Sequence, residues 1–157
     1  MPIGAYGGRR DIMDALMPIG EVYQAGTFSG NPVTMAGGIE VLRLLDDDSV
    51  YETLEARTAQ LFAGIAEFVT AKSLPIQLQR AGSMFSIIFS DIPVKNFVDS
   101  KRIDAERFAV FFNNLLANGV YLPPSSVDAA CVSAAHSEQD IEETVEKVAA
   151  ALKKAFA

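Results

Sequence analysis

Apolar side chains recur at helical spacing in four segments, and each segment follows a residue suited to begin a helix. Asn31 can cap the first, and Pro32 fits the first helical position because proline has no N–H group to leave unpaired. Ser49 opens a capping-box pattern before the second, and Asp104 and Ser137 precede the third and fourth. We therefore predict four helices. Their apolar positions are Met35, Ile39, Leu42 and Leu45; Leu54, Leu61, Ile65 and Phe68; Phe108, Phe111, Phe112, Leu115 and Leu116; and Ile141, Val145, Val148 and Leu152.

Shorter apolar runs predict strands between these helices. Ile76 and Leu78 alternate with glutamines, as on a half-buried strand, and the run MFSIIF that follows is more apolar. Gly119 follows the third helix at the position of a left-handed C-cap. The segments expected to be extended are 2–8 (PIGAYGG), 76–79, 84–89 (MFSIIF), 120–122 (VYL) and 131–134 (CVSA), and residues 9–16 are expected to form a short helix.

The order of these elements predicts a boundary near the acidic run Asp46–Asp48. From residue 49 the order is helix, strand, strand, helix, strand, strand, helix, which is typical of an α+β domain of helices packed on a small, mainly antiparallel sheet. Residues 1–48 would supply a strand, a loop and a long helix. Gly37 and Gly38 within that helix each cost about 1 kcal/mol relative to alanine, which predicts that another backbone packs closely there.

The composition excludes several classes of protein. Half of the 157 residues are hydrophobic and 21% are charged, as in an ordinary globular domain. A net charge of −7 without a basic stripe argues against nucleic acid as a partner, and the absence of an apolar run of about 18 residues argues against a membrane. The first ten residues lack the apolar region of a signal peptide. A single cysteine, Cys131, fits a reducing, cytoplasmic location and is expected to be a small buried side chain.

The stretch YQAGTFSGNP, residues 23–32, carries the strongest candidate chemistry. Gly26 and Gly30 let a backbone approach a ligand, Thr27 and Ser29 offer hydroxyl donors, and N–H groups near a helix N-terminus favour an anion. The same residues also suit a plain turn that caps the next helix, and residue spacing alone favours that simpler interpretation. No Walker lysine follows, so the stretch is not a P-loop.

The only histidine, His136, has Ser133 and Asp128 nearby in the sequence. A hydrolase triad is not indicated, because triads depend on the fold rather than on adjacency and no G-x-S-x-G motif is present. A structural histidine at the end of a strand is the better interpretation. One histidine and one cysteine also argue against a transition-metal site.

Three segments carry a family resemblance: MPIGAYGGRRDIMDALMP (1–18), YQAGTFSGNPVTMAGGIEVL (23–42) and SAAHSEQDIEET (133–144). Together they resemble the C-terminal part of the glutamate-1-semialdehyde 2,1-aminomutases, pyridoxal-phosphate (PLP) enzymes of the class III aminotransferase group. The resemblance implies the α/β fold-type I of PLP-dependent transferases. Residues 1–48 would then be the end of the large cofactor-binding domain with the interdomain helix, and residues 49–157 the C-terminal small domain.

The resemblance also implies roles for matched positions. In the family, the residues corresponding to Gly26 and Thr27 bind the cofactor phosphate of the neighbouring subunit in a homodimer, and the tyrosine corresponding to Tyr23 reaches the same active site. Asp128 falls where the family has a glutamate near the substrate. Val127 and Asp128 replace the usual phenylalanine–glutamate pair, so the carboxylate is shorter by one methylene.

The resemblance implies that the catalytic residues lie elsewhere. The family's Schiff-base lysine precedes the position of Met1, so we expect the 157 residues alone to be inactive and to bind PLP weakly and non-covalently at best, with none retained as a cofactor. The implied parent reaction converts glutamate-1-semialdehyde, a small amino-acid-derived substrate, to 5-aminolevulinate for tetrapyrrole synthesis. Two alternatives stay open: another class III aminotransferase, or a non-catalytic dimerisation module derived from one. A lysine-bearing reading frame upstream of Met1 would indicate a fragment, and a true start site would indicate a module.

Overall fold

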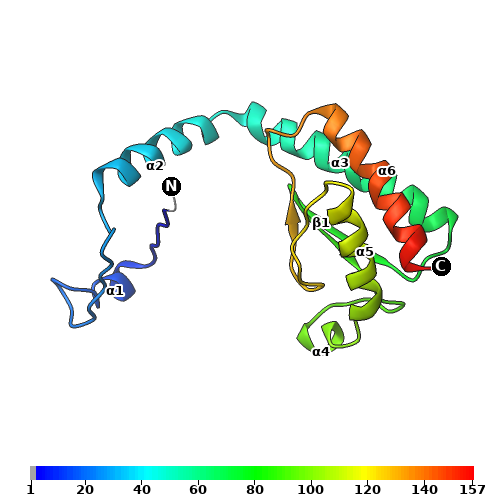
Figure 1. Cartoon of the computed structure of the whole chain (residues 1–157). Helices are drawn as coiled ribbons and strands as arrows, with labels where there is room; N and C mark the ends of the chain where they lie inside the picture. Colours follow the sequence, from blue (N-terminus) through cyan, green and yellow to red (C-terminus); the bar gives the residue numbers. More distant parts are fainter. Residues whose placement is uncertain (1–2) are drawn as a thin grey trace. The chain divides into compact units, whose positions relative to one another are not determined.

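A computed structural model describes residues 3–157, which divide at Asp48 into two compact units. Unit 1 comprises residues up to Asp48, and unit 2 comprises residues 49–157 (Figure 1). The elements in chain order are α1 (Arg10–Met13), α2 (Pro32–Leu45), α3 (Asp48–Ala71), β1 (Gln77–Ala81), β2 (Met84–Ile88), α4 (Phe97–Ser100), α5 (Ala105–Ala117), β3 (Ala130–Cys131) and α6 (Glu138–Ala155).

Unit 2 is a three-stranded antiparallel sheet packed with helices, which confirms the expected α+β arrangement. The strand order is β1-β2-β3, and β2 pairs with both neighbours: Phe85 lies opposite Arg80 on β1 and opposite Ala130 on β3. Side chains alternate between the two faces of a strand, so Phe85 and Ile87 both point into the core. The hydrophobic core therefore lies between one face of the sheet and the helices.

Aromatic rings and fully buried aliphatic side chains hold this core together. The ring centroid of Phe89 lies 5.3 Å from that of Phe111 on α5 and 5.8 Å from that of Phe156 at the end of α6. Leu115 and Leu152 have no solvent-exposed surface. Close contact between α3 and α6 requires a glycine, because a Cβ at Gly64 would lie 2.7 Å from the Val145 side chain. The four expected helices are confirmed, and most of the apolar positions of α3, α5 and α6 face this core, whereas the four apolar positions of α2 are exposed.

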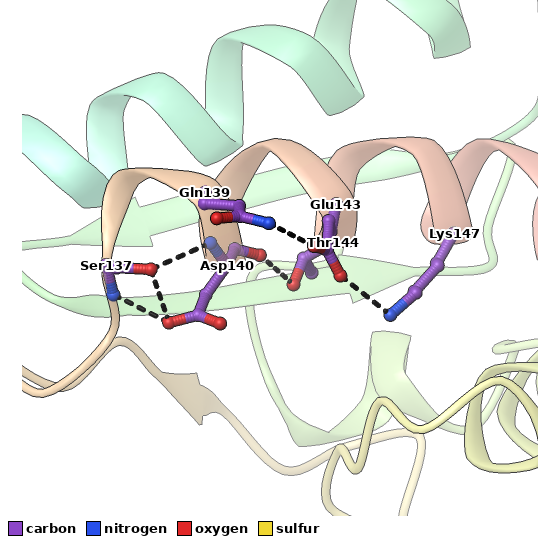
Figure 2. A network of polar contacts seen from close by, with 6 residues as sticks. All are labelled: Ser137, Gln139, Asp140, Glu143, Thr144 and Lys147. Atoms are coloured by element: carbon purple, nitrogen blue, oxygen red, sulfur yellow. Dashed lines mark hydrogen bonds and ion pairs between the residues drawn. The ribbon is translucent and has the colours of Figure 1, made fainter.

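The N-terminus of α6 carries a complete capping box (Figure 2). The Asp140 N–H donates to the Ser137 hydroxyl at 3.1 Å, and the Ser137 N–H donates to the Asp140 carboxylate at 2.8 Å. The Ser137 hydroxyl also donates to that carboxylate at 2.7 Å, which lowers the pKa of Asp140. A lowered carboxyl pKa stabilises the fold at neutral pH, and this contribution is lost as the pH falls through the folded-state pKa.

Two strand predictions in unit 2 differ from the structure. Residues 120–122 are not a strand. The strand expected at 131–134 is shorter and begins one residue earlier, because β3 comprises only Ala130–Cys131. Strand formation depends on a partner strand, and β3 is joined to β2 through only two paired positions. The short helix α4, which Asn96 caps, was not expected from the sequence. Gly119 has φ = +80°, as expected of a left-handed cap.

Unit 1 departs further from the expected elements. Residues 3–9 form no strand and Pro2 lies outside the described residues, while the helix expected at 9–16 is limited to α1. An isolated strand leaves its backbone groups unpaired, and residues 3–9 have no partner strand among the described residues. Ser49 lies within the first turn of α3 rather than at its cap, because this helix begins at Asp48, one residue before Ser49.

Of the two glycines in α2, only Gly38 has a close neighbour, and this neighbour is a side chain and not, as expected, another backbone. A Cβ at Gly38 would lie 2.7 Å from the Cδ1 atom of Ile3, whereas a Cβ at Gly37 would meet nothing within 4 Å. Gly38 therefore allows the N-terminal segment to lie against α2. The structure gives no comparable reason for Gly37.

Candidate functional site

The stretch 23–32 folds as two overlapping turns that lead into α2. The Ser29 N–H donates to the Gly26 carbonyl at 2.9 Å, and the Asn31 N–H donates to the Phe28 carbonyl at 3.1 Å. Gly30 has φ = +71°, a conformation that side-chain-bearing residues rarely adopt. Gly26 has its own constraint, because a Cβ there would lie 2.9 Å from the Ser29 hydroxyl. The two glycines therefore define the shape of the loop.

The helix cap is supplied by Asn31 and not by the hydroxyls of the loop. The Asn31 side-chain oxygen accepts the N–H groups of Val33 and Thr34 at 3.1 and 3.2 Å, as expected from the sequence. Among residues 3–157, no hydrogen bond involves the hydroxyl of Thr27 or Ser29. The backbone N–H of Thr27 is likewise unpaired within the described chain. These exposed donors are therefore available to water or to another external acceptor.

A hollow of about 1060 Å³ lies beside these donors, entirely within unit 1. No aspartate, glutamate, lysine, arginine or histidine is among its described lining residues. Apart from Gln24, Thr34 and the residues of the turns, the lining is the N-terminal segment and the apolar side of α2. It includes Ile3, Gly4, Ala5, Tyr6, Met35, Gly38, Ile39, Val41 and Leu42. The hollow can thus offer neutral hydrogen-bond donors and apolar surface.

The remaining candidate residues lie at exposed positions. Tyr23, just before the turns in unit 1, has 76% of its surface exposed. Asp128 is exposed in unit 2, where its N–H donates to the Ser125 carbonyl at 3.3 Å, and it is among the residues that line a small pocket with Ser86. The structure therefore brings Gly26 and Thr27 together in one loop, and it presents Tyr23 and Asp128 to solvent in separate units.

Aromatic side chains near the loop were not singled out from the sequence. Tyr6 and Phe28, which are 65% and 76% exposed, both line the hollow. Each stands beside a small residue or glycine in an irregular segment, so their exposure could be suspected from that context. The contact between residues 3–6 and α2 could not be predicted from the sequence, because it joins segments about thirty residues apart.

His136 serves a turn and is not arranged as a catalytic base. Its Nδ1 atom accepts the Ser133 N–H at 2.9 Å, and the Ser133 hydroxyl accepts the Ala135 N–H at 3.2 Å. The imidazole nitrogen and the hydroxyl are thus both used by the backbone of the same turn. The interpretation as a structural histidine at the end of a strand agrees with this geometry.

Cys131 is exposed, which corrects the expectation of a buried thiol. The physical reason is the register of β3: Ala130 points into the core, so its neighbour points to the other face of the sheet. Within residues 3–157, no three histidine, cysteine, aspartate or glutamate side chains are grouped closely enough to hold a metal ion. No helix in the same range has the length and apolar character needed to cross a membrane.

Comparison with known proteins identifies the family to which this sequence belongs. The sequence matches the family described as Aminotransferase class-III over residues 1–152, and the chain therefore belongs to that family. It is 45% identical over 156 residues to glutamate-1-semialdehyde 2,1-aminomutase 2 of Brevibacillus brevis, covering 99% of this chain and 36% of that protein. It is 46% identical over 153 residues to a glutamate-1-semialdehyde 2,1-aminomutase of Thermus thermophilus, covering 97% of this chain and 36% of that protein.

Solved structures support the same fold. An omega-transaminase from Sphaerobacter thermophilus superposes with a TM-score of 0.79 at 26% identity, covering 96% of this chain and 35% of that one. A glutamate-1-semialdehyde aminomutase from Pseudomonas aeruginosa PAO1 gives a TM-score of 0.75 at 21% identity, over 87% of this chain and 31% of that one. The chain thus has the fold of PLP-dependent transaminases of fold-type I. It spans about a third of the length of the curated relatives that it matches.

Proposed function

We propose that the chain is the C-terminal third of a longer, complete enzyme, a glutamate-1-semialdehyde 2,1-aminomutase. The observation that carries this proposal is the 45–46% identity, over nearly the whole chain, to proteins of that name. The solved structures do not separate the two activities, because the omega-transaminase is 26% identical and the Pseudomonas aeruginosa aminomutase 21% identical, so the preference rests on the curated relatives. The aminomutase is therefore preferred over an intermolecular aminotransferase. The complete enzyme would convert glutamate-1-semialdehyde to 5-aminolevulinate in tetrapyrrole synthesis.

The loop of unit 1 fits one part of the cofactor PLP, its phosphate group. The Thr27 hydroxyl and N–H are unpaired within residues 3–157, and a phosphate offers acceptor oxygens for such donors. Gly26 has no side chain, and a Cβ there would lie 2.9 Å from the Ser29 hydroxyl. Asn31 caps α2 independently, so the loop donors need not serve the helix. When bound, PLP supplies the electron sink that amine exchange requires. The residues of this loop would hold and orient the cofactor without taking part in proton transfer.

The surroundings of Thr27 support a homodimer in which the loop serves a neighbouring subunit. The described lining of the hollow contains no basic side chain, so the charge of a phosphate would need to be balanced by groups from elsewhere. Many apolar side chains of unit 1 are exposed, as in a surface that packs against other protein. These include Ile3, Tyr6, Ile12, Ile19, Phe28, Val33, Leu42 and Leu44.

Tyr23 and Asp128 are proposed to lie near the substrate of the complete enzyme. Both are solvent-exposed, as groups that approach a ligand must be. The phenol of Tyr23 can donate a hydrogen bond, and the carboxylate of Asp128 can accept one or hold an amino group. A cytoplasmic location is proposed on the chemistry of Cys131, an exposed and unpaired thiol that suits a reducing compartment.

The complete enzyme is expected to form 5-aminolevulinate from glutamate-1-semialdehyde without any added 2-oxo acid or amino donor. The reason is that both the amine and the aldehyde belong to one substrate. A coupled measurement of 5-aminolevulinate, with and without pyruvate, checks this expectation. Turnover only with an ω-amine plus a 2-oxo acid would instead identify an intermolecular aminotransferase. A complete reading frame without the Schiff-base lysine would identify a non-catalytic module.

The 157-residue chain alone is expected to bind PLP weakly and without a covalent bond. All six lysines of the chain belong to unit 2, whereas the phosphate-binding loop belongs to unit 1, and none of them matches the family's Schiff-base position. Absorbance spectra of the purified chain with PLP, before and after borohydride treatment, test this. Stoichiometric cofactor with a borohydride-reducible band would contradict it.

A further inference from the structure

The junction between β3 and α6 is held by a short turn in which the only histidine of the chain takes part. The backbone N–H of His136 donates to the Ser133 carbonyl at 3.1 Å, and the ring Nδ1 of His136 accepts the backbone N–H of Ser133 at 2.9 Å. The two residues are thus joined by two hydrogen bonds that run in opposite directions. Arg57 on α3 fixes the same turn, because its guanidinium donates to the Ala134 carbonyl at 2.8 Å.

The acceptor in this turn exists only when the imidazole is neutral. A neutral histidine that accepts through Nδ1 carries its proton on Nε2, whereas an imidazolium has two donors and no acceptor. Protonation of His136 therefore places an N–H group against the Ser133 N–H. The turn can then keep its other bonds, but the bond from the Ser133 N–H must be lost.

The charges around the turn decide where a protonated ring would go. The first turn of α6 presents the carboxylates of Glu138 and Asp140, and Asp140 stays ionised because its bonds from Ser137 lower its pKa. Arg57, on the side of α3, repels a second positive charge. Cys131 on β3 is a free and exposed cysteine. The acidic turn therefore attracts the imidazolium away from Ser133.

We propose that His136 is a pH-sensitive latch between β3 and α6. The neutral ring closes the turn through the Ser133 N–H, and the protonated ring releases it toward the acidic first turn of α6. Release weakens the attachment of β3, because this strand pairs with β2 at only two positions. Between β3 and the turn, the Val132 N–H donates to the Ser83 carbonyl at 2.9 Å. The latch is independent of the proposed enzymatic function.

The test is NMR of the full 157-residue chain, recorded at a series of pH values from about pH 8 to about pH 5. At high pH the ring nitrogen shifts should show the Nε2–H tautomer. As the ring titrates, the Ser133 amide shift should follow the same midpoint, and its hydrogen-exchange protection factor should fall about fivefold, the loss of one ordinary hydrogen bond. The Phe111 amide, in the core, serves as the internal reference and should not change.

Two variants complete the test. In His136→Asn, the side-chain oxygen can accept the Ser133 N–H at every pH, so the Ser133 amide should stay protected at low pH. In His136→Ala no acceptor exists, so protection should already be low at high pH. The proposal is overturned if the ring carries its proton on Nδ1 at high pH, if Ser133 protection is independent of pH in the parent chain, or if His136→Asn loses protection on acidification as the parent chain does.

Discussion

Hydrogen exchange of the 157-residue chain should show unit 2 about a thousandfold or more better protected than unit 1. Unit 2 contains a continuous core, including the fully buried Phe111, Leu115 and Leu152. Within residues 3–48, only Thr34 and Gly38 are buried. The 14 residues of α2 are too few for a stable isolated helix, because helices of about this length are marginal without tertiary packing.

The same experiment needs a control for association, because the exposed apolar side chains of unit 1 can be covered by a second copy. Exchange is therefore measured over a dilution series, with the molecular mass followed by sedimentation. We expect the protection of α2 amides to fall on dilution, while amides of α5 and α6 stay protected. Unit 1 amides that are as slow as the core of unit 2 in a strictly monomeric sample would contradict the prediction.

Replacing Thr27 by valine in the complete enzyme should weaken PLP binding by about ten- to a hundredfold. The change removes a hydroxyl at nearly constant volume. A hydrogen bond to a charged phosphate contributes roughly 1.5–3 kcal/mol, and about 1.4 kcal/mol corresponds to tenfold in affinity. Cofactor retention after dilution is the measurement. The loss should precede any change in kcat at saturating PLP, because the phosphate anchors the cofactor and does not react.

Two matched variants separate this role from a general effect on folding. Thr27→Ser keeps the hydroxyl and should recover most of the affinity. Thr70→Val makes the same chemical change at an exposed position on α3 and should leave PLP binding unchanged. Equal losses of cofactor in Thr27→Ser and Thr27→Val would show that the methyl packing of Thr27, and not its hydroxyl, supports the site.

The helices were predictable because their signals are local. Asn31 and Pro32, or Ser137 with its capping partner three residues later, act within one turn of the backbone, so no distant contact is needed. The strands were less predictable because each depends on a partner. Residues 120–122 have the composition of a strand but no neighbour to pair with among the described residues. The exposure of Cys131 likewise follows from the register of β3, which composition does not reveal.

The candidate site shows the same division. The residue types of the loop identified Gly26 and Thr27 as possible contacts for an anion, and the family resemblance gave them a role. Whether the loop hydroxyls also served the helix cap could be judged only from the structure, in which Asn31 alone accepts the N–H groups at the start of α2. The apolar wall that Ile3 and Tyr6 add to the hollow required knowledge of how the N-terminal segment lies on α2.

The most direct test of the phosphate role is the melting temperature of the complete enzyme with and without PLP, for the parent, Thr27→Val and Thr27→Ser. A ligand that binds the folded state raises the melting temperature by an amount that depends on its affinity. If Thr27 holds the phosphate, the PLP-dependent increase should shrink in Thr27→Val and largely return in Thr27→Ser. If Thr27→Val lowers the melting temperature of both forms equally and leaves the PLP-dependent increase unchanged, the residue only stabilises the loop, and the proposed phosphate site is wrong.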